Sequence, residues 1–353
     1  MNGQLRDGVV SVGGNARQQF HDARGYGTPD GGNAIRLSRV EAAHLLFRGD
    51  LDHIADHDGT HLDFESFFVA SASAVDRFAL RFLVYAELRD RGFYLSPARQ
   101  GWPGDDGRAW TDLTVYPRGT KPGDGDPAHR IVVVGERAAV PAVELGEVTL
   151  AVVDEESEIS YFETSVPEFD GGTTYRPPDS LTGSLIDDRV VVWDAPDDFF
   201  DHGFYGQPLS AREAIVDSAV QLSLVEAAGL AAEDCLDLQG EDDPAEAIGE
   251  RGRAVEGERF DRRLAVYRAL RDRHVVPKTG YKFGADFRTY ADVESVENLG
   301  HSELLVRVLP AGHEFDPRDL ALDVRLAHGV RKTMVFALVG DGIEWVQVER
   351  LTP

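Results

Sequence analysis

Leu37-Ser38-Arg39-Val40-Glu41-Ala42-Ala43 recurs in this chain, with one change, as Leu222-Ser223-Leu224-Val225-Glu226-Ala227-Ala228. A second stretch, Val84-Tyr85-Ala86-Glu87-Leu88-Arg89-Asp90-Arg91, returns as Val266-Tyr267-Arg268-Ala269-Leu270-Arg271-Asp272-Arg273. The two offsets are 185 and 182 residues. Because both stretches recur in the same order at nearly one offset, an internal duplication explains them better than chance or a short repeat period. We therefore expect two related copies, called here the first and second repeats.

Length and composition fit two such copies. The chain has 353 residues, 42% of them hydrophobic, which is enough for two or more domains that each bury a core. It contains no apolar run of about 18 residues and opens with no charged-then-apolar leader. Cys235 is the single cysteine, which excludes an intramolecular disulfide and a cysteine-based zinc site. We expect a cytoplasmic protein with no membrane segment, no structural metal and no cofactor.

The net charge is strongly negative. Sixty-two acidic residues against 36 basic ones give a formal charge of -26, which by itself argues against a nucleic-acid partner. Lysine, however, occurs at only four positions: Lys121, Lys278, Lys282 and Lys332. An acid-rich, lysine-poor surface is expected of a protein that works in concentrated salt, where the Debye length is about 3 Å at 1 M. Net charge therefore indicates a halophilic habitat more than a partner.

Local charge differs from the average. Eight basic residues lie between Arg262 and Arg288, against only Asp272 and Asp286. Two of the four lysines, Lys278 and Lys282, lie in this segment, which we call the basic island. We expect Lys278, Lys282 and Arg288 to contact an anionic partner.

Each repeat is expected to have two parts, giving an α/β (α+β) protein. The first part is a small domain of mixed helix and strand. The second begins with an amphipathic helix, 78–91 or 260–273, and continues into a compact α/β domain of short strands. The segment after residue 168 has the Gly and Pro density of a linker. The expected boundaries are 1–77, 78–168, a linker at 169–187, 188–259 and 260–353.

The second repeat carries three motifs in order. They read PKTGYKFGADFRTY (277–290), GHSE (300–303) and VRLAHGVRK (324–332). This run resembles the catalytic domain of the archaeal tRNA-splicing endonucleases, and a fused tandem of two related copies is one known arrangement of that family. The resemblance implies a catalytic triad of Tyr290, His301 and Lys332, and a precursor tRNA as substrate.

These residue types suit RNA cleavage. RNA supplies its own nucleophile, the 2′-hydroxyl, so cleavage needs a base, an acid for the leaving 5′-oxygen and a positive charge for the phosphorane oxygens. By resemblance, Tyr290 is the base, His301 the acid and Lys332 the electrostatic stabiliser. Nearby cations would favour the phenolate that the base requires. The products would be a 2′,3′-cyclic phosphate and a 5′-hydroxyl end, with no metal required.

Each triad residue also has an ordinary structural explanation. Tyr290 could be a packing residue, His301 a turn residue and Lys332 a surface cation. The scarcity of lysine argues against the last, because a chain that uses Arg almost everywhere needs a reason to keep a compact ammonium.

The first repeat is expected to be catalytically silent. Asp112-Leu113-Thr114-Val115-Tyr116 aligns with 286–290, so Tyr116 matches Tyr290, and His129 aligns loosely with His301. Alignment of Ala151 with Ala337 places Gly146 at the position of Lys332 and Ala139 at that of Arg325. The lysine is therefore missing.

A turn in the first repeat is acidic. It contains Asp154, Glu155 and Glu156, where the second repeat has Gly340-Asp341-Gly342. In the family, an acidic loop of the silent unit enters a basic pocket beside the active site of a neighbouring catalytic unit. The resemblance implies that these three residues bridge two chains in a homodimer; the alternative is one more acidic turn in an acidic protein.

The family recognises a bulge-helix-bulge RNA, holding bulged bases with flat cationic or aromatic side chains. Arg325 matches one such arginine, and stacking on an unpaired base is a recognised mode of RNA binding. Trp345 is our candidate for its partner, although a tryptophan of the core is at least as plausible.

Two rival functions stay open. A non-catalytic RNA-binding subunit would have no use for the three triad residues together. A metal-dependent nuclease would need paired carboxylates, and only Asp286 and Glu303 lie close to the motifs.

Overall fold

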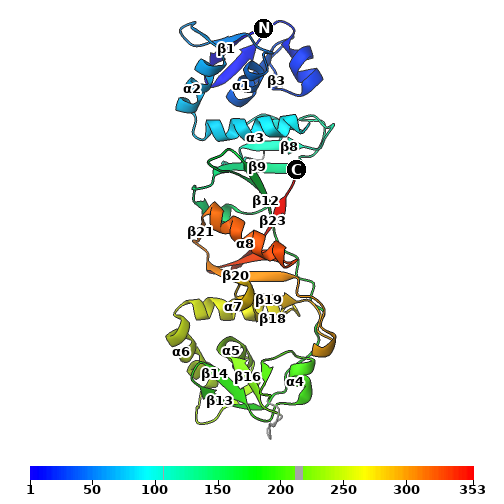
Figure 1. Cartoon of the computed structure of the whole chain (residues 1–353), viewed down its shortest axis with the longest axis vertical. Helices are drawn as coiled ribbons and strands as arrows, with labels where there is room; N and C mark the ends of the chain where they lie inside the picture. The colour runs from blue at the N-terminus through cyan, green and yellow to red at the C-terminus, as the bar shows by residue number, and fades with distance from the viewer. Residues whose placement is uncertain (106, 211–217) are drawn as a thin grey trace.

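The computed structural model describes residues 1–105, 107–210 and 218–353. The molecule is elongated, with the two N-terminal domains at opposite ends and a sheet between them (Figure 1). The C-terminus lies in the middle of the molecule, close to strands of the first repeat (Figure 1). The mixture of sheets and helices confirms the expected α+β class. Within the described residues, no helix combines the length and apolar character needed to cross a membrane.

The central sheet joins the two repeats. Its order is β18-β19-β20-β22-β23-β12-β11-β9-β8-β7, so each repeat supplies five strands in the same order. The first repeat supplies β7 (Tyr94–Pro97), β8 (Leu113–Tyr116), β9 (His129–Gly135), β11 (Thr149–Val153) and β12 (Ile159–Ser165). The second supplies β18 (Val276–Thr279), β19 (Phe287–Tyr290), β20 (Leu304–Pro310), β22 (Thr333–Val339) and β23 (Ile343–Leu351). Strands β12 and β23 pair antiparallel, with Glu163 opposite Glu349. The duplication was predicted from sequence, but this junction was not.

Helices cover the two faces differently. On one face, α3 (Phe78–Asp90) and α7 (Arg259–Arg271) each pack on the strands of their own repeat. On the other face, α8 (Pro317–Gly329) packs on β22 and β23. The first repeat replaces α8 by a single 3-10 turn, η2 (Ala142–Glu144). The core under α8 includes side chains of both repeats, among them Val132, Phe162 and Phe336, so the repeats share this core.

A small ladder also crosses between the repeats. Strand β10 (Val140–Pro141) precedes η2, and β21 (Glu314–Phe315) precedes α8. These two strands pair antiparallel, with Val140 opposite Phe315. Ala139 therefore lies before the place where a helix would begin, and the alignment of Ala139 with Arg325 is wrong, because the first repeat has lost the helix that carries Arg325.

The N-terminal domains also repeat each other. Their sheets have the orders β3-β4-β2-β1-β5-β6 and β15-β16-β14-β13-β17. The first contains β1 (Asn2–Arg6), β2 (Val9–Val12), β3 (Thr28–Pro29), β4 (Ile35–Ser38), β5 (His53–Ala55), β6 (His61–Leu62), η1 (Arg17–Asp22), α1 (Arg39–Phe47) and α2 (Phe64–Ala74). The second contains β13 (Leu181–Ile186), β14 (Arg189–Val192), β15 (Gln207–Pro208), β16 (Val220–Ser223), β17 (Leu236–Leu238), α4 (Asp197–Asp201), α5 (Leu224–Ala231) and α6 (Pro244–Glu256). Strand β13 lies inside the predicted linker 169–187, so the second domain begins earlier than expected. Its Thr182-Gly183-Ser184 segment has the composition of a linker but pairs with β14 and β17.

The recurring sequences have a local reason. Ser38 and Glu41 form a capping box at the start of α1, and Ser223 and Glu226 form the same box at the start of α5. In a capping box the serine and the glutamate each satisfy a backbone amide that the first helical turn leaves free. The repeated Leu-Ser-x-Val-Glu motif is therefore a helix start that both repeats retain.

Candidate active site

Three chain segments of the second repeat meet at Glu303. The Glu303 amide donates to the Thr289 carbonyl at 3.3 Å, and the Glu303 carbonyl accepts from the Thr333 amide at 3.0 Å. These contacts lie at the end of the sheet where β19 ends and where β20 and β22 begin. The residue after Thr289 is Tyr290, and the residue before Thr333 is Lys332. The backbone thus brings the segments that carry Tyr290, His301 and Lys332 to one end of the sheet.

Lys332 lies against the segment that carries His301. Its ammonium donates a hydrogen bond to the carbonyl of Ser302, the neighbour of His301, and lies 5.6 Å from the centre of the Phe283 ring. Partial burial, followed by the nearby charge of Arg288, lowers the pKa of Lys332. A positive charge is therefore held beside His301 in surroundings less polar than bulk water.

Tyr290 is almost buried, with 8% of its surface exposed. Its ring packs with Phe204, Val276 and Val293. The guanidinium of Arg288 lies 5.6 Å from the ring centre. The ring of Tyr290 is thus packed against apolar side chains, with one cation close by.

His301 is exposed at the end of the loop between β19 and β20. This loop contains the 3-10 turn η4 (Val296–Asn298). The N-terminal domain of the second repeat holds the loop: the Val296 amide donates to an Asp201 carboxylate oxygen at 3.1 Å, and His202 Nδ1 lies 2.5 Å from the Glu294 carbonyl oxygen. The imidazole is therefore open to a substrate while the loop beneath it is anchored.

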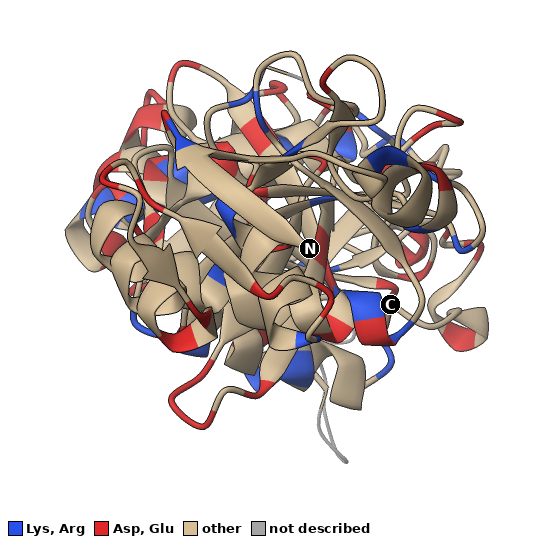
Figure 2. Ribbon diagram, turned by 90° about the horizontal axis from the view of Figure 1, so that it is seen from above, with Lys and Arg blue, Asp and Glu red and all other residues tan. Residues whose placement is uncertain are grey.

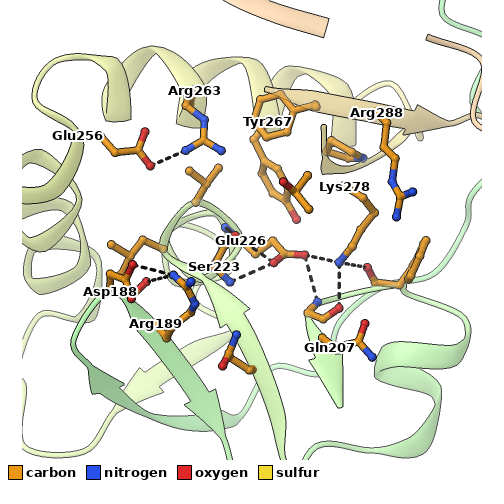
Figure 3. A pocket seen from close by; sticks show the side chains of 18 of the residues that line it. Asp188, Arg189, Gln207, Ser223, Glu226, Glu256, Arg263, Tyr267, Lys278 and Arg288 are labelled. Atoms are coloured by element: carbon orange, nitrogen blue, oxygen red, sulfur yellow. Dashed lines mark hydrogen bonds and ion pairs between the residues drawn. The ribbon is translucent and has the colours of Figure 1, made fainter. Parts of the chain in front are cut away.

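The basic island is largely used inside the protein. Arg263 pairs with Glu256 and Asp286, and Arg271 donates to the Gly203 carbonyl and lies over the Tyr205 ring. Lys278 is 11% exposed and forms an ion pair with Glu226 (Figure 3). This position does not support the prediction that Lys278 contacts RNA. Lys282 is exposed in η3 (Tyr281–Phe283) and Arg288 is partly exposed, so these two remain available to a ligand.

Arg325 and Trp345 lie on opposite faces of the sheet. Arg325 is exposed on α8, the helix that covers one face. Trp345 packs with Val335 and Ala337 on the face that α7 covers, and its ring meets that of Phe169 at 4.7 Å between centres. The two side chains cannot hold one bulged base between them, because the sheet separates them. Trp345 is therefore not retained as the partner of Arg325.

Two hollows lie at the second repeat, the second of them beside its junction with β12 of the first repeat. One, of about 410 Å³, lies between its two domains (Figure 3), and most of its cations face acids, such as Arg189 beside Asp188. The other, of about 630 Å³, lies beside Lys332 at the start of β22 and is lined by His328, Arg331 and Arg350 together with the carboxylates of Glu163 and Glu349. Three cations and two carboxylates line this hollow, which adjoins Lys332 of the candidate triad.

Comparison with known proteins gives the family. A family model described as the tRNA intron endonuclease catalytic C-terminal domain matches residues 260–345, and the model of the N-terminal domain matches 1–68 and 181–247. The chain belongs to the tRNA intron endonuclease family. The catalytic match falls on the second repeat, which carries the complete triad, whereas the N-terminal match falls on both repeats.

Relatives of the same length share the whole chain. The tRNA-splicing endonucleases of Haloarcula marismortui and Natronomonas pharaonis are 57% and 56% identical, over 99% and 100% of both chains. That of Methanosarcina barkeri is 35% identical over 99% of both chains. The first two relatives are haloarchaeal, which bears out the halophilic origin predicted from composition. Acidic residues lie all around the periphery when the molecule is viewed along its long axis (Figure 2).

Within this family framework, the first repeat can be aligned through a duplicated ion pair. Asp112 pairs with Arg77 and Arg81, and Asp286 pairs with Arg259 and Arg263. Each aspartate also accepts from a backbone amide of the next strand, that of Val133 or Val308. Asp286 is thus engaged in holding α7 on the sheet.

The alignment tests the expected counterparts of the triad. Tyr116 and Tyr290 each lie four residues after the paired aspartate, so they correspond. His129 lies four residues before Val133 and corresponds to Leu304, not to His301; the loose alignment was wrong because the loop before β9 differs from that before β20. Ala151 and Ala337 do correspond, each opposite the equivalent valine, which places Gly146 where Lys332 stands.

Tyr116 is also covered. It is 1% exposed, and a Cβ added to Gly104, in the insertion that replaces the 278–284 segment, would lie 2.6 Å from the Tyr116 hydroxyl. Burial raises the pKa of Tyr116. The first repeat thus has a shielded tyrosine and no lysine at the corresponding edge.

The acidic turn projects from the β11–β12 hairpin. Asp154 accepts the amides of Glu156 and Glu158, which shapes the turn. Glu155 pairs with Arg137 at 2.5 Å, and Glu155 and Glu156 are both exposed. Two carboxylates are therefore presented at the tip.

Proposed function

We propose that this chain is a tRNA-splicing endonuclease that cuts precursor tRNA at the boundaries of its intron, in the cytoplasm. The full-length relatives carry that name, and the catalytic-domain match covers the second repeat. The observation that carries the site assignment is the meeting of three segments at Glu303, with the ammonium of Lys332 on the carbonyl next to His301.

In the proposed reaction, Tyr290 removes the proton of the 2′-hydroxyl beside the scissile bond. The 2′-oxygen attacks the phosphorus, and the bond from phosphorus to the 5′-oxygen breaks as His301 gives that oxygen a proton. Lys332 stabilises the charge on the phosphorane oxygens. The products are a 2′,3′-cyclic phosphate and a 5′-hydroxyl. Since the RNA supplies the nucleophile, the chemistry needs no metal-bound water.

Substrate recognition is proposed to combine shape and charge. Arg325 would stack on a bulged base of a bulge-helix-bulge RNA, with Lys282 and Arg288 contacting phosphates. Two chains would form a homodimer, in which Asp154, Glu155 and Glu156 of each enter the basic hollow beside Lys332 of the other. Charge supports this pairing, because the turn is acidic and the three cations of the hollow, Arg331, Lys332 and Arg350, outnumber its two carboxylates, Glu163 and Glu349.

Cleavage of a bulge-helix-bulge RNA in the presence of EDTA tests the proposal. We expect cleavage with 2′,3′-cyclic phosphate ends, and a loss of about 10² to 10⁴-fold in rate for His301→Ala, the range for a general acid. Lys332→Ala should also cleave more slowly. The first repeat offers matched controls: His129→Ala and Tyr116→Phe should cleave at the rate of the unaltered protein.

Two results would contradict this mechanism. A 3′-hydroxyl product would show a different reaction, and unchanged rates for both His301→Ala and Lys332→Ala would remove the site assignment. The alternative of a non-catalytic RNA-binding subunit predicts binding without any cleavage. It is not favoured, because the full-length relatives are endonucleases by name and the second repeat matches the catalytic domain.

A further inference from the structure

Phe204 connects the second N-terminal domain to Tyr290. The two rings meet edge to face, with centres 5.4 Å apart and planes at 66°. Phe204 has a φ of 50°, in the left-handed region that side chains other than glycine rarely adopt. The first repeat has Gly25 at this position, with a φ of 65°. The second repeat therefore carries a side chain where the backbone favours glycine.

The correspondence of Phe204 with Gly25 rests on a shared contact. Two residues later, the Gly27 amide donates to Glu41 and the Gly206 amide donates to Glu226. These glutamates belong to the duplicated capping boxes. The exchange of Gly25 for Phe204 is thus a true difference between the repeats.

Lys278 fastens the segment that contains Phe204. Its ammonium donates to the carbonyls of Phe204 at 3.2 Å and Gly206 at 3.0 Å, and to Glu226 Oε1 at 2.8 Å (Figure 3). These three bonds use all the donors of an ammonium group. The first repeat has Ser96 here, since Ser96 pairs with Thr114 as Lys278 pairs with Arg288. Only the second repeat has this tether.

The same segment also holds the His301 loop. Asp201 and His202, just before Phe204, contact Val296 and the Glu294 carbonyl. One short stretch, 201–206, therefore touches both the ring of Tyr290 and the loop that ends in His301.

We propose that the N-terminal domain of the second repeat positions the catalytic groups, with Phe204 and Lys278 as positioning residues. Phe204 fixes the orientation of the Tyr290 ring, and Lys278 fixes Phe204. This inference rests on the proposed role of Tyr290 as the base. It gives a reason for retaining a buried lysine in a chain that has only four.

A packing explanation competes with this one. In the first repeat a Cβ on Gly25 would lie 2.8 Å from the Tyr94 ring, so Tyr94 fills the space from the opposite side. Tyr94 corresponds to Val276, since Tyr94 pairs with Tyr116 and Val276 pairs with Tyr290. If volume alone mattered, the first repeat's arrangement would serve equally well in the second.

The experiment separates volume from positioning. Phe204→Leu and the double variant Phe204→Gly/Val276→Tyr, which copies the first repeat, are compared in single-turnover cleavage and in RNA binding. We expect both to cleave more slowly, by as much as about 10²-fold, the loss that a 1 Å misplacement can cause. RNA affinity should be unchanged. Phe20→Leu, which truncates another buried ring but in the first repeat, should leave the cleavage rate unaltered.

The Tyr290→Phe background provides the second readout. If Phe204 acts through the Tyr290 hydroxyl, Phe204→Leu should lower the residual rate of Tyr290→Phe by much less than it lowers the wild-type rate. Should Phe204→Leu fail to fold, Lys278→Met provides the same comparison.

Failure of the proposed function and failure of the positioning role give different results. An unimpaired Tyr290→Phe would overturn the proposed function. A strong effect of Tyr290→Phe with no effect of Phe204→Leu, full cleavage by the double variant, or equal losses in both backgrounds would overturn the positioning role alone.

Discussion

Lys332 carries the positive charge of the proposed site in surroundings that weaken its hold on the proton. Partial burial and Arg288 lower its pKa. The stabilising charge is therefore present at neutral pH and lost as pH rises through a value below the 10.5 of an ordinary lysine. Arginine stays charged throughout this range. We expect Lys332→Arg, whatever its absolute rate, to keep its activity to higher pH than the unaltered protein.

Single-turnover rates from neutral pH to about pH 11 would measure the difference. The two proteins differ only at position 332, so the comparison isolates the side chain at that position. Two profiles of identical shape would show that the charge of Lys332 does not limit cleavage in this range.

The sequence indicated which residues to consider for the site, but not which side chains surround each of them in the fold. The resemblance of the three motifs to the catalytic domain of the family implied Tyr290, His301 and Lys332, and the structure brings the segments that carry them to one end of the central sheet. Lys278 has the same residue type as a surface cation, and nothing in the linear pattern shows that Glu226, 52 residues away, pairs with it. Composition alone did not mark Phe204 as important. The feature that distinguishes it is that the first repeat has Gly25 at the same position.

At the scale of the element, α1 carries a buried titratable group. His44 is 2% exposed and its Nδ1 lies 2.9 Å from the Tyr26 hydroxyl oxygen. Burial, followed by the charges of Arg89 and Arg48, lowers the pKa of His44 to about 4. Because the folded-state pKa lies below the ordinary 6.5, the stabilising contribution is complete above pH 6.5 and is lost as pH falls toward 4.

The expected loss of stability between pH 6.5 and pH 5 is about 2 kcal/mol, at 1.36 kcal/mol per pH unit. Denaturant unfolding in concentrated salt at pH 7 and pH 5 would measure it. His44→Gln should reduce this pH dependence, since glutamine does not titrate. A variant as acid-sensitive as the unaltered protein would assign the effect to other groups.

Elements were predictable where a local pattern defines them. The helix starts of α1 and α5 are encoded by capping boxes that recur in the sequence. The loss of α8 from the first repeat could not be predicted, because a deletion leaves no residue to mark it, and Ala139 was aligned with a helix that is absent. Strand β13 was assigned to the linker, because its small polar residues resemble one and its pairing with β14 is tertiary information.

At the scale of the whole molecule, the repeats are one body. The edge strands β12 and β23 pair, and each thereby satisfies the backbone of the other. No sequence pattern predicted this pairing, since each strand alone has the alternation of any edge strand. The junction places the acidic turn and the candidate triad at strand ends on the same side of the ten-stranded sheet, with β12 and β23 between them.

That arrangement makes the proposed dimer testable. Within one chain Glu155 pairs with Arg137, and strand β23 lies between β12, which follows the turn, and β22, which follows Lys332. We therefore propose that the hollow beside Lys332 receives the turn of a second chain. Reversing both exposed charges, Glu155→Lys with Glu156→Lys, should place like charges against Arg331 and Lys332 of the partner. We expect the variant to be a monomer in sedimentation measurements. It should also cleave RNA at a much lower rate, because the partner's turn no longer occupies the hollow beside Lys332.

Asp341→Lys in the equivalent turn of the second repeat is the matched control and should remain dimeric. A dimeric, fully active double-lysine variant would place the contact between chains elsewhere.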